Sequence, residues 1–197
     1  MAQEKKKRIV TWDDPMPGAA ASREMGGLPF LWAILAGEQP PPPIGELMGF
    51  EPLEVEEGRA LFVCTPAEYH YNPIGAVHGG LACTLLDSAM GCAVHTMLPA
   101  GVGYTTVELK VSFLRPITLK TGRLLCEGTI IHLGSRIATA EARLLDTSGK
   151  LYGHATTTCM ILRNLAPEQS KPFVGESLAS EDDERVRLAG RRPVEVS

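Results

Sequence analysis

The sequence has no excess of basic residues, since 19 Lys and Arg stand against 23 Asp and Glu in 197 residues, a formal net charge of −4. A surface that follows nucleic-acid phosphates needs clustered positive charge, so we expect no nucleic-acid partner. The glycine-rich phosphate-binding patterns and G-x-S-x-G are also absent, and nucleotide-binding and serine-hydrolase functions lose their main support. The length fits one medium-sized domain with extensions.

Cysteines are few and show no C-x-x-C pair, which argues against a disulfide framework. Each lies in an apolar or strand-like context, as reduced core residues of a cytoplasmic protein do. An export signal is not expected, because the basic residues near the N-terminus are followed by the polar stretch 12–15 instead of an apolar run. The five cysteines are Cys64, Cys83, Cys92, Cys126 and Cys159.

Long uninterrupted apolar runs are missing as well. The longest apolar stretch, 79–98, contains Asp87, His95 and several glycines, so we do not predict a membrane span. The histidines show no ligand spacing with cysteines or carboxylates. We therefore expect neither a metal nor another cofactor.

The same stretch is apolar on nearly all sides when drawn as a helix, which predicts a buried helix. Asp87 is its one carboxylate. An ionised Asp in such a setting costs several kcal/mol unless it is hydrogen-bonded, neutralised or faces a wet cleft. Asp87 is therefore either a structural residue that caps a loop or pairs with an Arg, or part of a reactive site.

A turn-rich segment, 72–80, leads into this helix. At the helix N-terminus, unpaired backbone N–H groups and the positive end of the helix dipole point outward and can hold an oxyanion. Asn72 and His78 add two polar side chains to the segment. They serve either a reactive site or only the backbone of their own loop.

The remaining patterns predict an α+β fold. In 104–115 apolar residues alternate with polar ones, which is typical of a long half-buried strand. Several long antiparallel strands with one early apolar helix indicate a strongly curved sheet wrapped around a central helix. The predicted strands are 47–56, 59–65, 104–115, 122–133, 135–145 and 150–162.

We divide the chain into three parts. Residues 1–44 form an N-terminal arm in which 1–22 lack periodicity, 23–36 suggest a short helix and 40–43 form a proline-rich lead-in. Residues 45–163 form the main domain. Residues 164–197 are polar without a sustained period, and we expect a disordered tail.

The run NPIGAVHGGLACTLLDSAMG resembles the signature of the PaaI-like acyl-CoA thioesterases of the hotdog-fold superfamily, and TTVELKVSFLRP resembles their following strand. The similarity extends from about Gly45 to Leu162, and the spacing of Asn, His-Gly-Gly and Asp makes it specific. The resemblance implies a hotdog fold, with a long curved antiparallel sheet around one helix. It also implies hydrolysis of a fatty or aromatic acyl-CoA thioester to the free acid and coenzyme A.

The resemblance assigns roles to five residues. Asp87 is the general base or the nucleophile, the backbone N–H of Gly79 is the oxyanion donor, and Thr106 is a hydroxyl partner of Asp87 or its water. Asn72 and His78 orient the water or the carbonyl. Substrate contacts are expected at Gly80, Met90, Val94, Gly134, Ser135 and Arg136.

The last three of these residues form a predicted hairpin turn that contacts the nucleotide part of coenzyme A in the family. An exposed Arg in an ordinary turn is the alternative.

Gly79 and Asp87 are eight residues apart, so one helix separates their backbones by about 12 Å. A single carbonyl hardly reaches both groups, which predicts a homodimer, or a homotetramer made of two dimers, with sites shared between chains. A monomer with a structural Asp87 is the alternative. Two other functions stay open: a hotdog-fold enoyl-CoA hydratase or dehydratase, and a non-catalytic acyl-CoA binding protein.

Overall fold

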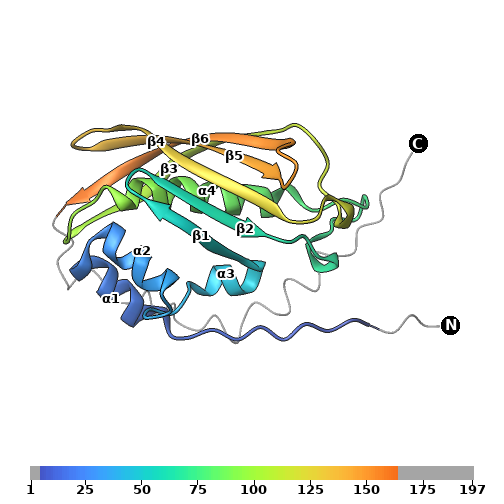
Figure 1. The fold of residues 1–197 in the computed structure, drawn as a ribbon, viewed down its shortest axis with the longest axis horizontal. Coiled ribbons are helices and arrows are strands. Elements are labelled where there is room, and N and C mark those ends of the chain that lie inside the picture. The colour runs from blue at the N-terminus through green and yellow to red at the C-terminus, as the bar shows by residue number, and fades with distance from the viewer. Residues whose placement is uncertain (1–4, 164–197) are drawn as a thin grey trace, which may run out of the picture. The chain divides into compact units, whose positions relative to one another are not determined.

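The computed structural model describes residues 5–163, and the predicted tail 164–197 lies outside them. Two short 3-10 helices, η1 (Glu68–His70) and η2 (Leu119–Thr121), accompany four α-helices and six strands (Figure 1). The helices are α1 (Pro15–Met25), α2 (Gly27–Leu35), α3 (Pro43–Met48) and α4 (Gly79–Thr96). The strands are β1 (Phe50–Glu56), β2 (Arg59–Cys64), β3 (Val102–Phe113), β4 (Leu124–Leu133), β5 (Ile137–Asp146) and β6 (Leu151–Arg163).

The six strands form one sheet in the order β1-β2-β4-β5-β6-β3, and every neighbouring pair is antiparallel. The helix α4 lies across the inner face of this sheet, as Figure 1 shows. The layout is the α+β arrangement predicted from the sequence. No helix within residues 5–163 is both long and apolar enough to cross a membrane.

Small residues on the inner face let the sheet approach α4 closely. Ala138, Ala140 and Ala142 on β5 are at most 2 % exposed. On β4, a Cβ added to Gly128 would lie 2.4 Å from the backbone of Ala89, so strand and helix touch backbone to backbone at this point. This enclosure explains why α4 is apolar on nearly all sides.

The N-terminal helices differ from the prediction. Residues 1–22 were expected to lack regular structure, but α1 begins at Pro15, where the side chain of Asp14 accepts a hydrogen bond from the N–H of Met16 (2.9 Å). Asp at the N-cap and Pro at the first helical position are both start signals. Gly26, with a φ of +79°, divides the predicted 23–36 helix into two.

Both helices pack against the C-terminal end of α4. The N–H of Gly27 donates to the carbonyl of Leu98 (3.0 Å), and a Cβ added to Gly27 would lie 1.7 Å from the carbonyl oxygen of His95. On α1, the Ser22 hydroxyl lies 3.3 Å from the Nε2 atom of His95.

The prediction of a first strand from residue 47 is wrong at its start. Residues 43–48 form α3, which begins with Pro43 and ends at Gly49 in the left-handed conformation, with a φ of +70°. Proline at the start and glycine just past the end are typical of a short helix. The strand β1 therefore starts at Phe50.

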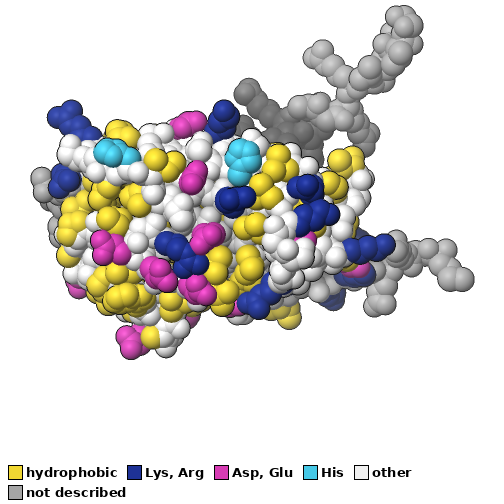
Figure 2. All heavy atoms as spheres, turned by 45° about the horizontal axis from the view of Figure 1, so that its top comes forward, with side chains coloured by type: hydrophobic (Ala, Val, Ile, Leu, Met, Phe, Trp, Pro, Cys, Tyr) yellow, Lys and Arg dark blue, Asp and Glu magenta, His cyan; other side chains and the backbone are white. Residues whose placement is uncertain are grey.

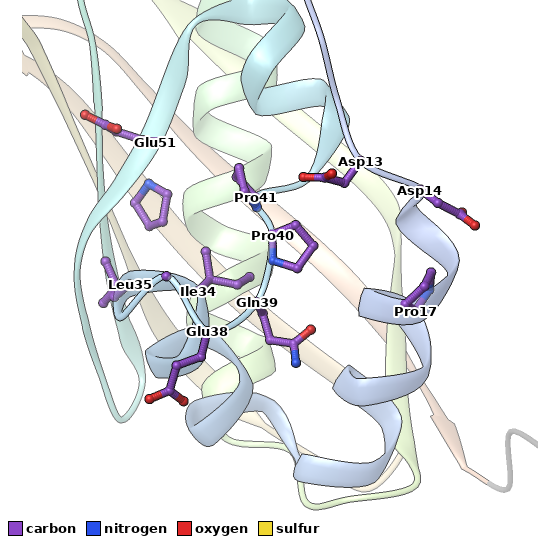
Figure 3. Close-up of a pocket in the computed structure, with 12 residues that line it drawn as sticks. Asp13, Asp14, Pro17, Ile34, Leu35, Glu38, Gln39, Pro40, Pro41 and Glu51 are labelled. Carbon is purple, nitrogen blue, oxygen red and sulfur yellow. The ribbon is translucent and has the colours of Figure 1, made fainter.

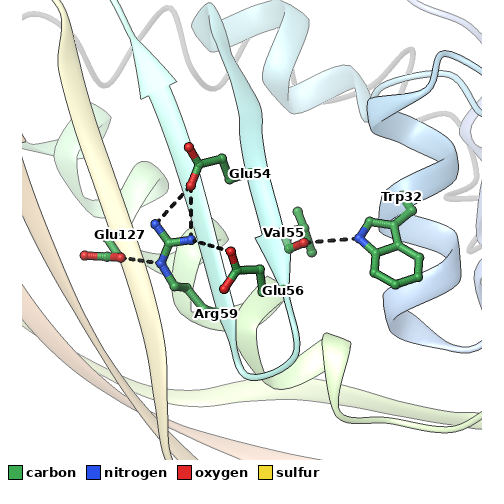
Figure 4. A network of polar contacts seen from close by, with 6 residues as sticks. All are labelled: Trp32, Glu54, Val55, Glu56, Arg59 and Glu127. Atoms are coloured by element: carbon green, nitrogen blue, oxygen red, sulfur yellow. Dashed lines mark hydrogen bonds and ion pairs between the residues drawn. The ribbon is translucent and has the colours of Figure 1, made fainter.

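Figure 4 shows how the β1–β2 hairpin is held. The indole N–H of Trp32 on α2 donates to the carbonyl of Val55 (3.1 Å) and ties the helix to β1. On β2, the Arg59 guanidinium pairs with carboxylates of β1 and β4. These are Glu54, Glu56 and Glu127.

The surface carries charges of both signs. Figure 2 shows apolar side chains scattered among basic and acidic ones, which agrees with the small net charge. Three exposed apolar residues, Ile131, Ile137 and Met160, lie on β4, β5 and β6.

Candidate active site

Asp87 lies in the middle of α4, on the side of the helix that the sheet leaves partly open. Its Oδ1 atom accepts a hydrogen bond from the Thr106 hydroxyl of β3 (3.0 Å). The structure therefore brings these two predicted site residues together. A bond from a hydroxyl to an ionised carboxylate is stronger than a neutral one, and it fixes the direction of the carboxylate.

A β-bulge turns Thr106 toward α4. In the pairing of β3 with β6, Thr106 lies opposite Cys159 and Glu108 opposite Thr158, so Val107 is one residue too many. Bulges of this kind redirect side chains. The strict alternation read from the sequence puts Thr106 on the same face as Glu108, whereas the observed strand turns Thr106 inward and Glu108 outward.

The cysteines around Asp87 are neutral thiols. Burial raises the pKa of the Cys92 thiol to about 12, and the charge of Asp87 adds to the effect. Burial and Asp87, in the same order, raise the pKa of Cys83. A thiol must ionise to act as a nucleophile, so the cysteines are poor candidates and Asp87, the one carboxylate on α4, is the better one.

Tyr104 is a neighbour of the site that the sequence did not reveal. Its hydroxyl would lie 2.7 Å from a Cβ added to Gly91, which is one helical turn beyond Asp87. Burial raises the pKa of Tyr104 well above its usual range, and the nearby carboxylate of Asp87 adds to this. The sequence offered one signal for this contact: Gly91, four residues after Asp87, leaves room on α4 for a large side chain.

The start of α4 carries a free donor. His78 is the N-cap, and its Nδ1 atom accepts a hydrogen bond from the N–H of Gly80 (2.9 Å), which leaves Nε2 as the protonated nitrogen of the neutral ring. The N–H of Gly79 has no partner among residues 5–163. An unpaired N–H at the positive end of a helix is suited to an oxyanion.

Phe113, at the end of β3, lies directly over Gly79. A Cβ added to Gly79 would meet the Phe113 ring at 3.1 Å, although this ring is 57 % exposed. A hollow of about 360 Å³ adjoins the pair, so Gly79 can be reached from outside. Its lining residues are Val77, His78, Gly79, Ala82, Phe113, Leu114, Arg115, Pro116 and Ile117.

Asn72 holds its own loop. Its Oδ1 atom accepts hydrogen bonds from the N–H groups of Ile74 (3.1 Å) and Ala76 (3.3 Å). This is the second of the two roles that the sequence allowed. The other predicted role, orienting the water or the carbonyl, stays a prediction, since these two hydrogen bonds use only the amide oxygen.

Met90 and Val94, predicted as substrate contacts, lie in the interior of the protomer. Both are fully buried, with 0 % exposure, and belong to the hydrophobic core that α4 forms with the sheet. A helix that is apolar all round does not show in its sequence which of its residues face a ligand. Gly80 is at the helix start, where its N–H is already bonded to His78.

The predicted turn 134–136 is present but lies far from Gly79 of the same chain. The carbonyl of Ser135 accepts a hydrogen bond from Arg163, which pairs with Val102 at the start of β3. Gly79 lies at the other end of β3, and a twelve-residue strand is about 40 Å long. Within one protomer, Gly134, Ser135 and Arg136 therefore do not join the helix start.

A larger hollow of about 830 Å³ lies elsewhere, between the N-terminal helices, the proline-rich segment and β1 (Figure 3). Four carboxylates line it, from Asp13, Asp14, Glu38 and Glu51. It contains no residue of the segment 72–80 or of α4, so its size does not make it the reactive site.

Comparisons with known proteins identify the family and the fold. The model of the thioesterase superfamily matches residues 74–152. A protein of Saccharolobus solfataricus named as an esterase is 32 % identical over 111 residues, which are 56 % of this chain and 77 % of that protein. One of Halobacterium salinarum, also named as an esterase, is 42 % identical over 69 residues, or 34 % of this chain and 44 % of that protein.

Solved structures show the same fold. A protein of Ralstonia eutropha, named as a thioesterase related to phenylacetic acid degradation, is 29 % identical. Its TM-score is 0.60 over 66 % of this chain and 98 % of that one. A Streptococcus mutans protein bound to acetyl-CoA is 22 % identical, with a TM-score of 0.53 over 58 % and 90 % of the two chains.

The curved antiparallel sheet around α4 defines the hotdog class, and the predicted fold is confirmed. This chain belongs to the thioesterase superfamily, so the predicted family and reaction class, thioester hydrolysis, are confirmed as well.

Proposed function

We propose that this protein hydrolyses acyl-CoA thioesters with a fatty or aromatic acyl group. The observation that carries the proposal is the pair of reactive features on α4: the carboxylate of Asp87 held by Thr106, and the N–H of Gly79, which has no partner in the described part of the chain. Thioester hydrolysis needs a base or nucleophile and a donor for the developing oxyanion, and these groups supply both.

In the proposed reaction, the thioester carbonyl oxygen accepts a hydrogen bond from the N–H of Gly79. Asp87 either takes a proton from the attacking water or attacks the carbonyl carbon itself, and Thr106 keeps the carboxylate oriented. Negative charge then collects on the carbonyl oxygen, where the N–H and the dipole of α4 stabilise it. The C–S bond breaks, and the thiolate takes up a proton to give coenzyme A. If Asp87 acted as the base, the free acid leaves at the same step; if Asp87 attacked the carbonyl carbon, a water then hydrolyses the mixed anhydride on Asp87, which releases the free acid and restores the carboxylate.

The spacing of Gly79 and Asp87, about 12 Å along α4, supports a site made by two chains. The strand β3 lies at the edge of the sheet, and Val107 and Phe113 on it are 54 % and 57 % exposed. Two β3 strands paired antiparallel about a two-fold axis would carry Gly79 of one protomer toward Asp87 of its partner. We propose a homodimer, or a homotetramer of two such dimers.

The choice of acyl-CoA rests on the relatives, and the proposed location rests on the cysteines. The Streptococcus mutans protein holds acetyl-CoA, and the name of the Ralstonia protein refers to phenylacetic acid. All five cysteines are free, as in a protein of the reducing cytoplasm, where we place the enzyme.

The experiment is a thiol-release assay over straight-chain acyl-CoAs and aryl-CoAs, with the wild-type protein and Asp87→Asn. Turnover by the wild type that is lost in Asp87→Asn supports the proposal. Absence of turnover on every thioester, with binding retained, would favour a non-catalytic acyl-CoA binder. Addition of water to an enoyl-CoA without thiol release would favour a hydratase.

A further inference from the structure

Residues 5–14, which precede α1 and are called the arm from here on, carry a cluster of positive charge that the proposed reaction does not use. Lys5, Lys6, Lys7 and Arg8 follow one another in a chain whose net charge is −4. The arm has no regular structure and runs past α3 before α1 begins (Figure 1). Four adjacent like charges repel one another, and an anionic ligand would relieve this repulsion.

The arm is fastened at Arg8. Its guanidinium donates to the carbonyls of Leu47 (2.7 Å) and Glu46 (2.8 Å) in the last turn of α3, and it lies 4.0 Å over the ring of Tyr69. The free carbonyls of a helix end attract a cation, and an aromatic face does the same. Lys6 forms an ion pair with Glu68, so the arm lies along the loop that precedes α4.

Arg8 and Val10 of the arm form one wall of a hollow of about 520 Å³. The same hollow is lined by His78 and Gly80, the residues on either side of the proposed oxyanion donor. Most of the remaining lining is apolar. It comes from Leu47, Met48, Tyr69, Tyr71 and Leu81.

We infer that the arm and this hollow hold the coenzyme A half of the substrate. The pantetheine chain would lie in the hollow, and the phosphate groups would contact Lys5 and Lys7. The inference rests on the proposed function, because it takes the thioester to sit at Gly79.

The charges fit this placement. Lys5 and Lys7 are exposed, and neither makes an ion pair within the described residues. Lys5 and Lys7 do not line the hollow themselves, and three residues of extended chain allow Lys5 to lie up to about 10 Å from Arg8, which does. With the acyl carbonyl of the thioester at the start of α4, the pantetheine chain would therefore lie in the apolar hollow. The phosphate groups at the far end of coenzyme A would then lie near the lysines.

The test compares two ligands that differ only in their nucleotide part. We would measure the affinities of coenzyme A and of pantetheine, which lacks phosphates, by calorimetry, and kcat/KM for the same acyl group on each carrier. The variants are Lys5→Ala/Lys7→Ala, which removes two charges, and Lys5→Arg/Lys7→Arg, which keeps them. Exposed ion pairs of this kind predict that the preference for the coenzyme A ligand falls by about threefold to tenfold in the alanine variant.

The arginine variant should keep the preference, and added salt should reduce that of the wild type, because the Debye length falls from about 30 Å at 0.01 M to about 8 Å at 0.15 M. An unchanged preference in the alanine variant would refute the inference, as would an equal loss for both ligands. The binding measurement decides this without turnover, so loss of the proposed activity in the assay above remains a separate result.

Discussion

Replacing Gly79 by proline tests the oxyanion donor without removing a bond inside the protein. The N–H of Gly79 has no partner within residues 5–163, and Gly79 is the first residue of α4, where proline is accepted. The preceding residue, His78, already has the extended backbone that proline requires, with φ −63° and ψ 135°. Gly79→Pro should therefore keep the helix start and lose only the donor.

The control is Gly79→Ala, which adds a Cβ at the same place and keeps the N–H. The added Cβ meets the Phe113 ring at 3.1 Å, but an exposed ring can move by a few tenths of an ångström. Loss of one oxyanion donor lowers kcat by about 10²–10³. We expect that loss in the proline variant and only a small loss in the alanine variant.

The assay is thiol release from an acyl-CoA that the wild type hydrolyses, with the far-ultraviolet circular dichroism of each variant as the folding check. Equal activity of the proline and alanine variants would refute the role of the N–H. If both are inactive, Gly79→Ala/Phe113→Ala separates the causes. Recovery in this double variant would show that contact with the ring, not the donor, controls the rate.

Three further predictions concern the carboxylate and the assembly. Asp87→Asn should keep the fold and lower turnover by about 10²–10⁴, the usual contribution of a general base, and unchanged thiol release would make Asp87 structural. Thr106→Val should lower kcat while Thr106→Ser retains it, since only serine keeps the bond to Asp87; equal rates would mean that the 3.0 Å hydrogen bond does not matter for catalysis. Mixing Asp87→Asn with Gly79→Pro chains should recover about a quarter of the wild-type activity, because about half of the re-paired dimers are mixed and each has one intact site. No recovery from verified mixed dimers would mean that one chain supplies both groups.

The sequence predicts most of the fold because its strongest patterns are local. Apolar residues on all sides of 79–96 predict the enclosed helix, and alternation predicts the strands of the sheet. The helix α1 was missed because its Pro/Gly/Ala-rich composition hides a start signal, Asp14 followed by Pro15, that is only two residues long. The short α3 was missed for a similar reason, since its ends at Pro43 and Gly49 are close together.

The candidate site was predictable only in part. Asp87 stands out as a lone carboxylate, and the meeting of Thr106 with it follows from the family resemblance. The inward direction of Thr106 depends on a bulge, which a pairing partner imposes and an isolated strand does not show. The faces of Met90 and Val94 likewise depend on which side of α4 the sheet covers.

The bulge at Val107 determines which face of the sheet each side chain of β3 occupies on either side of it. Deletion of this one residue would restore regular pairing and force one half of the strand to rotate relative to the other. Leu109 and Val111 pack against the core, so the half that contains Thr106 would turn outward. The fold could then survive while Asp87 loses its hydroxyl partner, and the length of this strand would matter to the enzyme as much as the identity of its side chains.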